Sequence, residues 1–413
     1  MHSFEKAKHI VHLLQQANHE AYFAGGWVRD FLLGHPSDDI DIATSATPQE
    51  VQKLFPQNIP IGVAYGIILV LMDHEPFEIA TFRKDLEYVD GRHPSKIEFT
   101  HPKEDALRRD FTINGMFYDP IKGKVLDFVK GQKDLENKIV RAIGNPHERF
   151  EEDRLRMVRA IRLACRFNFS IEDETAKAIK KHAKELFPAV AIERIWQELM
   201  KMSNYNHFDV ALTKLFEFGL LQQIFPKLNT LSLQAIKKRT ANIRQLSLDV
   251  PIIGKIMQLF EQLDLLQIKQ LCEYLKLSKK DTQFALFLCE AQLNFKNNMQ
   301  LNWENYDWAV FLAHPYAEWT LEIISLHLSV DHRKKLFKQI EELSKILAPS
   351  IERLKNKKKI ISSERLKNEG IQEGTTLGFL LKESERLSAN LTLNDAEKVL
   401  DLLKKSKLWP KDL

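Results

Sequence analysis

A cluster of carboxylates in the segment DDIDIAT, residues 38–44, is the clearest sign of chemistry in this sequence. Side chains alternate between the two faces of a β-strand, so Asp39 and Asp41 are expected on one face and Ile40 and Ile42 on the other. Two like charges held together need a counter-charge, and Mg²⁺ is usually held by one or two carboxylates together with substrate phosphates. The spacing therefore predicts a metal site at the two aspartates, although a cluster of capping or turn aspartates has the same composition.

A pair of glycines upstream of this strand indicates a place for a phosphate. The segment AGGWVRDFLLG, residues 24–34, has Gly25 and Gly26 at a predicted strand-to-helix junction. Glycine lets the backbone approach a ligand closely, and free helix N–H groups favour a bound anion. Arg29 follows in the first turn of the predicted helix, where a cation is unfavourable for the helix dipole. This position is explained if Arg29 reaches a triphosphate; the alternative is a glycine turn with a surface arginine.

A third carboxylate, Glu78, belongs to the predicted strand FEIATFR at residues 77–83. It alternates with Phe77 and Ile79 and therefore faces away from them. Glu78 could complete the metal site from a neighbouring strand, and a solvated strand face explains it equally well.

Length and composition favour a protein of several domains. The chain has 413 residues, of which 44% are hydrophobic, and a formal net charge of +4. This mildly basic balance permits nucleic-acid binding without requiring it. Three cysteines without CxxC spacing favour a reducing compartment. We find no signal peptide and no run of about 18 apolar residues, so we expect a cytoplasmic protein that does not enter a membrane.

Hydrophobic periodicity divides the chain into two kinds of structure. Up to about residue 145, short apolar runs predict strands, with one helix at WVRDFLLG. From residue 146 onward apolar residues recur at steps of three and four, which predicts helices. The charged segment 351–370 is expected to form a hinge before a final helical module at about 360–413. The predicted fold class is α+β, with a mixed head and an all-helical remainder.

Several segments together resemble the motifs of class II tRNA nucleotidyltransferases, the CCA-adding enzymes, and of the related bacterial poly(A) polymerases, within the DNA polymerase beta superfamily. The resemblance is strongest over residues 20–200 and rests on GGWVRDFLLGHPSDDIDIAT, RRDFTINGMFYD and EEDRLRMVRAIRLACRF. LEYVDGRHPSKIEFT is similar to the family's flexible loop, AIERIWQELMKM to its last motif, and GIQEGTTLGFLLKESERL to its C-terminal tail. The similarity thus covers nearly the whole chain.

The resemblance implies a division into four parts. It implies a nucleotidyltransferase head with a small mixed β-sheet at 1–145 and a helical neck for base recognition at 146–205. It further implies a helical body for RNA binding at 206–350 and a helical tail at 351–413.

The resemblance also implies roles for individual residues. Asp39 and Asp41 would be catalytic and bind Mg²⁺, with Glu78 as a possible third carboxylate. The implied nucleotide-binding residues are Gly25, Gly26, Arg29, Arg109, Asp110, Asp153, Arg156, Arg159 and Arg162, with Asp110 on the ribose and the last four in the neck. One departure is NGMFYD at 114–119, which leans toward the poly(A) polymerase branch.

The neck segment 151–167 suggests how a base could be selected. A single helix over it would make Asp153 and Arg156 neighbours. Its other side would carry a core stripe, composed of Met157, Ile161 and Ala164. A carboxylate only accepts hydrogen bonds and a guanidinium only donates them. One fixed Asp–Arg pair would therefore match the amino group and ring nitrogen of cytosine or adenine, and would reject uracil and guanine.

The expected reaction is template-independent addition of CCA to a tRNA 3′ end from CTP and ATP, without an obligate protein partner. The alternatives are an enzyme that adds only A, a poly(A) polymerase, and a catalytically inactive RNA-binding relative. Basic stretches at 236–244, 331–338 and 356–360 are candidates for phosphate contacts, or are solvated helix faces. Gly91 and Pro94 are expected to make a mobile loop that helps to reshape the site for the final A.

Overall fold

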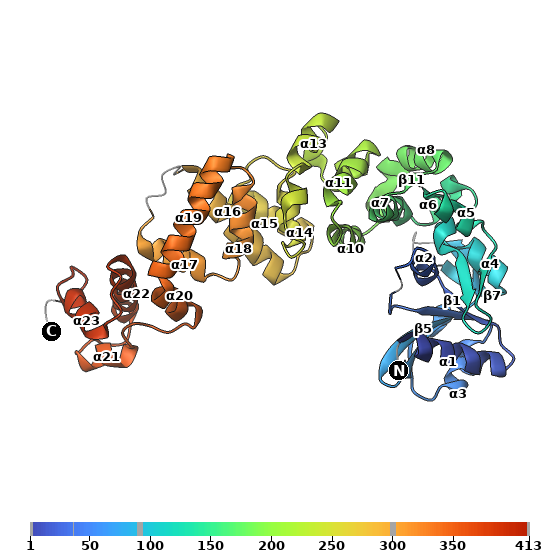
Figure 1. Cartoon of the computed structure of the whole chain (residues 1–413), viewed down its shortest axis with the longest axis horizontal. Coiled ribbons are helices and arrows are strands. Elements are labelled where there is room, and N and C mark those ends of the chain that lie inside the picture. The colour runs from blue at the N-terminus through green and yellow to red at the C-terminus, as the bar shows by residue number, and fades with distance from the viewer. Residues whose placement is uncertain (1–2, 36, 89–93, 298–302, 411–413) are drawn as a thin grey trace. The chain divides into compact units, whose positions relative to one another are not determined.

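A computed structural model describes residues 3–35, 37–88, 94–297 and 303–410 of the chain. The chain forms two compact units, Met1–Arg244 and Gln245–Leu413 (Figure 1). Of the predicted flexible loop, Gly91 lies outside the described residues, and only the backbone of Pro94 lies within them.

A seven-stranded mixed sheet forms the first part of unit one, in the order β3-β4-β5-β2-β1-β8-β9 (Figure 1). β2 and β5 are parallel, and the other neighbouring pairs are antiparallel. The strands are β1 (Ala21–Ala24), β2 (Asp41–Thr44), β3 (Asn58–Gly62), β4 (Ile67–Met72), β5 (Glu75–Thr81), β8 (Met116–Asp119) and β9 (Lys124–Asp127). A separate antiparallel pair consists of β6 (Arg83–Tyr88) and β7 (Pro94–Phe99).

Helices cover this sheet through apolar faces. In α1 (Ser3–Gln16), the residues at three- and four-residue steps, Ala7, Ile10, Val11 and Leu14, are fully buried. In α2 (Gly26–Leu32), Trp27 stacks on Phe31 and packs edge-on against Phe23 of β1. The remaining helices of the head are α3 (Pro48–Leu54), α4 (Pro102–Leu107) and α5 (Gly131–Glu136), with single 3₁₀ turns η1 (Val63–Tyr65) and η2 (Thr112–Asn114).

The second part of unit one is helical, with one exception. β10 (Ile139–Val140) pairs in parallel with β11 (Ser170–Ile171), so the segment predicted as an all-helical neck contains a short strand. Its helices are α6 (Pro146–Glu152), α7 (Leu155–Phe167), α8 (Asp173–His182), α9 (Leu186–Ala189), α10 (Ile192–Ser203), α11 (Phe208–Glu217), α12 (Leu220–Ile224) and α13 (Leu233–Thr240), with 3₁₀ turns η3 (Ala183–Glu185), η4 (Pro226–Leu228) and η5 (Ile243–Gln245), the last reaching one residue into unit two.

The predicted helix over 151–167 is interrupted. α6 ends at Glu152, and Asp153 has extended backbone angles before α7 begins at Leu155. The Asp153 carboxylate accepts a hydrogen bond from the backbone N–H of Leu155 at 3.0 Å, a local bond that competes with a continuous helix. The predicted core stripe of α7 is confirmed, because Met157, Ile161 and Ala164 are all buried.

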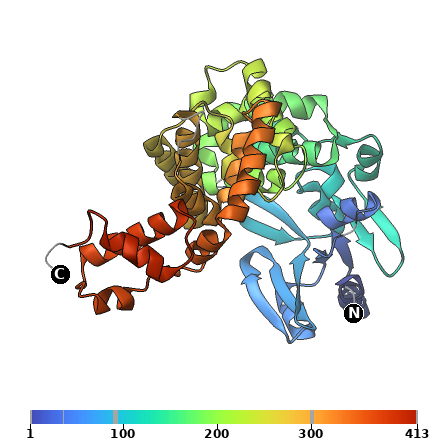
Figure 2. The same cartoon turned by 60° about the vertical axis from the view of Figure 1, so that its left-hand side comes forward.

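Unit two is entirely helical within its described residues. Its helices are α14 (Ile252–Met257), α15 (Leu265–Tyr274), α16 (Lys279–Asn297), α17 (Asn305–Ala313), α18 (Ala317–Ser325), α19 (Val330–Ile346), α20 (Ala348–Lys355), α21 (Ser363–Asn368), α22 (Thr375–Asn390) and α23 (Ala396–Lys404). The last three, red in Figure 2, enclose a hydrophobic cluster of their own that includes Leu366, Leu380 and Leu403. This cluster agrees with a final helical module after residue 360.

The predicted fold class is confirmed: a mixed sheet with helices precedes a largely helical remainder. The predicted boundaries at 145, 205 and 350 stay a prediction, because the structure separates the chain only near residue 244. Among the helices that the structure describes, none combines the length and the apolar character that a membrane span requires.

Candidate active site

The predicted carboxylates lie on two adjacent parallel strands, at and just before the start of β2 and in the middle of β5. β2 and β5 pair with Ile42 opposite Ile79, so the preceding residues, Asp41 and Glu78, leave the sheet on the same face. Asp39 comes two residues before Asp41, immediately ahead of the strand. The three acidic residues are exposed, whereas the residues between and after them are buried, with Ile40 4% and Ile42 1% exposed. The alternation predicted from the sequence is therefore present.

The pKa values of these carboxylates show that negative charge is crowded here. The pKa of Asp41 is raised to about 6, first by desolvation and then by the charges of Glu78 and Asp39, while the nearby Arg109 acts in the opposite direction. The pKa of Glu78 is also raised, first by desolvation and then by Asp39. Glu78 thus belongs to the same electrostatic cluster as the two aspartates, and the cluster has more negative charge than the adjacent arginine balances.

This cluster fits a divalent cation in its chemistry but is not a complete coordination sphere. Hard cations prefer carboxylate oxygens, and Mg²⁺ commonly takes only one or two of them and completes its octahedron with water and phosphate oxygens. Within the described ranges, no group of three or more His, Cys, Asp or Glu side chains has metal-binding geometry. The residues therefore suit a metal that arrives with a phosphorylated substrate.

Gly25 and Arg109 border the carboxylates. Gly25 precedes α2 with φ 70° and ψ −133°, a conformation that side chains with a Cβ rarely adopt. A Cβ at Gly25 would lie 3.2 Å from Nη1 of Arg109 and 3.8 Å from Oδ2 of Asp41. The other guanidinium nitrogens of Arg109, Nε and Nη2, donate to the buried Asp105 at 3.1 and 2.9 Å. Asp105 thus fixes Arg109 with one nitrogen facing the glycine turn and Asp41.

Arg29 has a different environment from the surface position considered for it. It is only 4% exposed, and its Nε donates to Asp30 at 2.8 Å. Its Nη1 donates to Asn114, and its guanidinium lies 4.6 Å from the ring centre of Phe167. Gly26 adjoins this side chain, because a Cβ there would lie 3.4 Å from Nη2 of Arg29. Contact of Arg29 or Gly26 with a phosphate stays a prediction.

Asp110 lies between the head and α7. Its carboxylate accepts from Arg159 at 2.8 and 2.5 Å and from the Asn114 amide at 3.1 Å. Burial alone would raise the pKa of Asp110, but Arg159 and the Asn114 hydrogen bond outweigh it and hold that pKa well below its usual range. Asp110 also raises the pKa of Arg159, so this pair stays charged at neutral pH. The predicted ribose contact of Asp110 stays a prediction.

In the neck, the side chains of Asp153 and Arg156 pair with other residues and not with each other. Asp153 accepts from Arg194 of α10 at 2.8 Å, and Arg156 pairs with Glu152 at 2.5 Å. The helix break at Asp153 explains why: the two predicted partners do not share one continuous helix. The prediction of one continuous helix is therefore wrong, but Asp153 and Arg156 are still neighbours, because the backbone N–H of Arg156 donates to the carbonyl of Asp153 at 3.1 Å.

Arg162, the other predicted neck residue, pairs with the buried Glu198 of α10 at 2.5 Å. Arg159 also approaches Glu198, at 3.9 Å. Sequence reasoning did not single out Glu198, Arg194 or Asn114. Glu198 and Arg194 lie in AIERIWQELMKM, where charged residues among apolar ones could have indicated buried ion pairs.

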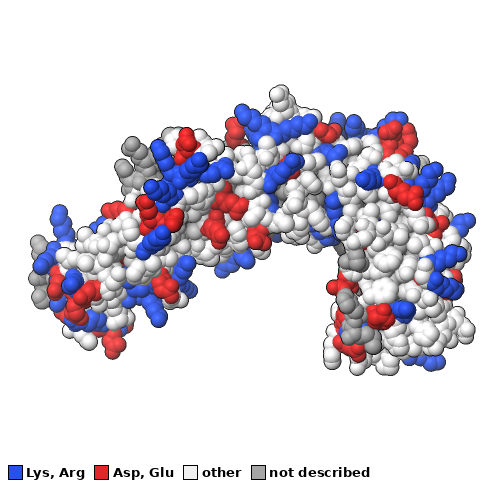
Figure 3. Space-filling model, viewed as in Figure 1, with Lys and Arg blue, Asp and Glu red and all other residues white. Residues whose placement is uncertain are grey.

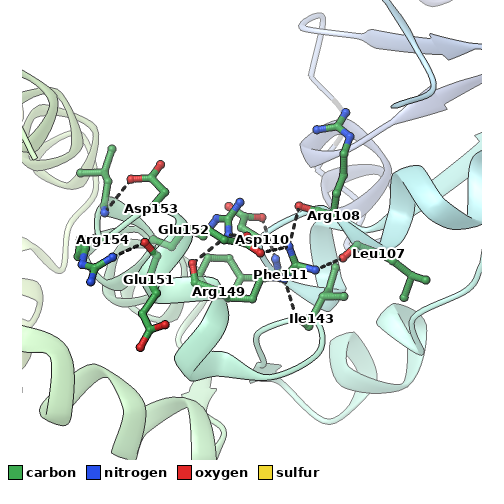
Figure 4. A network of polar contacts seen from close by, with 12 residues as sticks. Leu107, Arg108, Asp110, Phe111, Ile143, Arg149, Glu151, Glu152, Asp153 and Arg154 are labelled. Carbon is green, nitrogen blue, oxygen red and sulfur yellow. Dashed lines mark hydrogen bonds and ion pairs between the residues drawn. The ribbon is translucent and has the colours of Figure 1, made fainter. Parts of the chain in front are cut away.

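Arg149 of α6 connects the neck to the end of α4 (Figure 4). Its guanidinium donates to the backbone oxygens of Leu107 and Ile143 and to the carboxylate of Glu152. Arg149 therefore orients Glu152, and Glu152 in turn holds Arg156. A guanidinium with five donors is suited to such a junction, because it satisfies several carbonyl oxygens at once.

Comparisons with known proteins agree with this architecture. Residues 21–141 match the model of the poly A polymerase head domain, and residues 168–231 match that of a probable RNA and SrmB-binding site of polymerase A. The chain is 42% identical over 225 residues to a CCA-adding enzyme of Bacillus cytotoxicus, which is 54% of this chain and 56% of that protein. It is 47% identical over 200 residues to one of Ligilactobacillus salivarius, or 48% and 49% of the two lengths.

The matched stretch thus spans about half the length of these curated relatives. Over nearly the full length, the fold is similar to the crystal structure of a Bacillus stearothermophilus CCA-adding enzyme in complex with CTP. The TM-score is 0.79 and the identity 25%, with 98% of this chain and 97% of the other covered. Residues 21–141 and 168–231 are thus similar to two parts of poly A polymerases, and the whole fold is similar to that of a CCA-adding enzyme.

Proposed function

We propose that this protein is a template-independent nucleotidyltransferase that adds CCA to the 3′ end of tRNA from CTP and ATP. The observation that supports this most directly is the carboxylate cluster of Asp39, Asp41 and Glu78 beside Gly25 and Arg109. Such a cluster suits a triphosphate with its metal, because it combines acceptors for a cation with a donor for phosphate oxygens. One solved structure with a similar fold is a CCA-adding enzyme in complex with CTP.

The reaction is attack of the RNA 3′-hydroxyl oxygen on the α-phosphorus of the nucleotide. A new P–O bond forms, the bond to the β-phosphate breaks, and pyrophosphate leaves. Positioning and charge neutralisation dominate such phosphoryl transfers. Arg109, held by Asp105, would donate to the phosphate oxygens, and the open backbone at Gly25 would let them approach closely. Asp41, whose pKa of about 6 leaves it ionised at neutral pH, is suited to take part in binding the metal.

Mg²⁺ is the cation that these ligands favour. When bound, it would lower the pKa of the attacking hydroxyl and neutralise charge on the leaving group. Asp39 and Asp41 would hold it, and Glu78 is placed to help because it shares their face and their electrostatic cluster. The raised pKa values of Asp41 and Glu78 come first from desolvation and then from carboxylate repulsion, and a bound cation would offset both effects.

Base selection would occur in the neck. Asp153 and Arg156 carry the acceptor and donor that cytosine or adenine requires. In this structure Asp153 pairs with Arg194, and Arg156 pairs with Glu152. To hydrogen-bond a base, each residue would have to share its partner or release it. The pairs Asp153–Arg194 and Glu152–Arg156 would keep the reading groups charged and oriented before the nucleotide arrives.

RNA would bind to the helical parts through its phosphates. Figure 3 shows Lys and Arg side chains over α13 and over α19 on the face in view. These helices contain most of the predicted stretches 236–244 and 331–338, and the third, 356–360, follows α20. Arg244 also pairs with Asp209 at 2.9 Å, so part of the positive charge on the first stretch is already neutralised. Which residues contact RNA stays a prediction.

The second candidate is an enzyme that adds only A, or a poly(A) polymerase. The match to a poly A polymerase head domain and the NGMFYD segment favour it. A catalytically inactive RNA-binding relative is the weaker alternative, because the acidic cluster and the bordering Arg109 are all present.

The deciding experiment offers the purified protein three tRNA transcripts, lacking CCA, ending in C, or ending in CC. CTP, ATP or both are supplied with Mg²⁺, and product lengths are measured. A CCA-adding enzyme adds two C and one A, then stops. Extension of only the CC-ended transcript by ATP would identify an A-adding enzyme. Long product ladders on any RNA would identify a poly(A) polymerase. No extension would identify an inactive relative.

A further inference from the structure

A closed ring of polar contacts joins the head to α7. Arg159 of α7 donates to Asp110 at 2.8 Å, and Asn114 donates to the same carboxylate at 3.1 Å. Asn114 in turn accepts from Arg29, which pairs with Asp30 at 2.7 Å. Asp30 then accepts from Arg166 at 3.1 Å, back on α7.

The ring spans the two turns of α7 between Arg159 and Arg166. Seven residues of an α-helix bring side chains back to nearly the same face. One face of α7 is therefore tied at both ends to the head: at one end through the segment 110–114 and at the other through α2. This arrangement limits how α2 and α7 can move relative to each other.

Asp30 is the member of the ring that holds two arginines at once. Its Oδ1 accepts from Arg29 and its Oδ2 from Arg166. Both guanidiniums also lie over the ring of Phe167, at 4.6 and 4.7 Å from its centre. Asp30 is 5% exposed and Arg29 4%. The guanidinium groups of Arg29 and Arg166 repel each other in this largely water-excluded site, and the Asp30 carboxylate between them offsets that repulsion.

We propose that Asp30, through Arg166, is a positioning residue that sets the distance between the glycine turn and the nucleotide-reading face of the neck. The proposal rests on the proposed function, in which phosphates lie at Gly25 and the base lies in the neck. A nucleotide bound in this way bridges the two sides of the ring. Asp30 does not contact the substrate; it holds α2, whose first residue follows Gly25, against the helix that carries Arg156, Arg159 and Arg162.

This role predicts a particular kinetic pattern. Opening the ring at Asp30 would loosen the fit of the nucleotide between head and neck while leaving Asp39, Asp41 and Glu78 in place. The KM values for CTP and ATP should rise about tenfold, with kcat changed by less than about threefold, because an interaction that orients bound substrate is weakened without loss of the chemical groups. Incorporation of UTP relative to CTP should rise, because selection needs the neck at a fixed distance.

The test compares Asp30→Asn, Arg166→Gln and the double variant on a tRNA transcript lacking CCA. Arg166 is 25% exposed at its side chain, so glutamine is tolerable there even if Asp30→Asn does not fold. Glu75→Gln is the matched control, since it also exchanges a head carboxylate for an amide and breaks an ion pair, with Lys6 at 3.0 Å, that does not reach the neck. Unfolding midpoints of all variants are measured alongside.

Because Asp30 and Arg166 act as a pair, the double variant should lose no more than the worse single variant. Support is a raised KM and raised UTP incorporation in Arg166→Gln and in the double variant, both absent from Glu75→Gln. Equal KM and discrimination in Arg166→Gln and Glu75→Gln would overturn the inference, as would additive losses in the double variant. A wild-type protein that extends no RNA would overturn the proposed function instead.

Discussion

Replacing Asp41 by asparagine should stabilise the folded protein while it abolishes nucleotide incorporation. In the unfolded chain Asp41 has a pKa near 4, and in the fold this pKa is raised to about 6. The folded state therefore binds a proton more tightly, so stability falls as pH rises from about 4 to about 6 and then stays level. A shift of about two units corresponds to roughly 3 kcal/mol as an upper bound. Because the side chain is exposed, screening by solvent reduces this to about 1–2 kcal/mol.

At pH 7.5 the Asp41→Asn variant should therefore be about 1–2 kcal/mol more stable than the wild type, which is a rise of about 2–8 °C in Tm for a unit of this size. At pH 4 the two proteins should be equally stable. Mg²⁺ should stabilise the wild type more than the variant, because a ligand stabilises the state that binds it. Hydrogen exchange of the amides in β2 and β5, measured in the full chain under denaturant, reports the stability of this unit separately from the other.

The control is Asp73→Asn, at the exposed turn between β4 and β5. It makes the same chemical change in the same sheet but lies at the far end of β5 from Glu78. Its stability difference from the wild type should not depend on pH between 4 and 7.5. The reasoning is refuted if Asp41→Asn is less stable than the wild type at pH 7.5, or if its advantage is the same at both pH values.

Further substitutions test other parts of the site. Asp39→Ala should abolish incorporation while RNA binding, measured by filter retention, persists; near-normal turnover would remove Asp39 from the metal site. Gly25→Ala should destabilise the protein by about 1–3 kcal/mol in chemical unfolding, because alanine rarely adopts its backbone conformation, and an unchanged midpoint would contradict the strained turn. Asp110→Asn should cost about 2 kcal/mol at pH 7 by removing the main charged partner of the partly buried Arg159, and should remove the loss of wild-type stability below about pH 4 that its lowered pKa implies. Arg194→Gln should change discrimination among the four nucleotides, because it frees Asp153; identical incorporation ratios would show that this ion pair has no part in base selection.

The local parts of the site could be predicted from the sequence because they depend on short-range rules. Alternation along a strand predicted that Asp39 and Asp41 face away from Ile40 and Ile42, and the structure confirms it. The same rule gave the orientation of Glu78. The paired glycines at residues 25 and 26 indicated an unusual backbone at the strand-to-helix junction, and Gly25 has a positive φ of 70° there. Each of these conclusions requires only a few consecutive residues.

The partners of the arginines could not be predicted in this way. Helical spacing keeps Arg156 next to Asp153 along the backbone, but it does not determine the partners of their side chains, and the helix is interrupted at Asp153. The observed partners, Arg194 for Asp153 and Glu198 for Arg162, come from α10, which is about 40 residues away in the sequence. An ion pair across such a separation depends on how helices pack, and charge patterning alone leaves several equivalent pairings.

Ion pairs with arginines, some local and some long-range, account for the buried carboxylates of the head and the neck. Asp30, Asp105 and Glu198 are each at most 5% exposed, and each forms ion pairs with two arginines. A buried carboxylate is costly unless its hydrogen bonds are satisfied, and a hydrophobic contact would hold the two parts together at least as well. Charged pairs instead fix direction, because a guanidinium and a carboxylate bind well only in a narrow range of geometries. The proposed function would need such fixed directions, since an enzyme that selects bases without a template must do so with its own side chains.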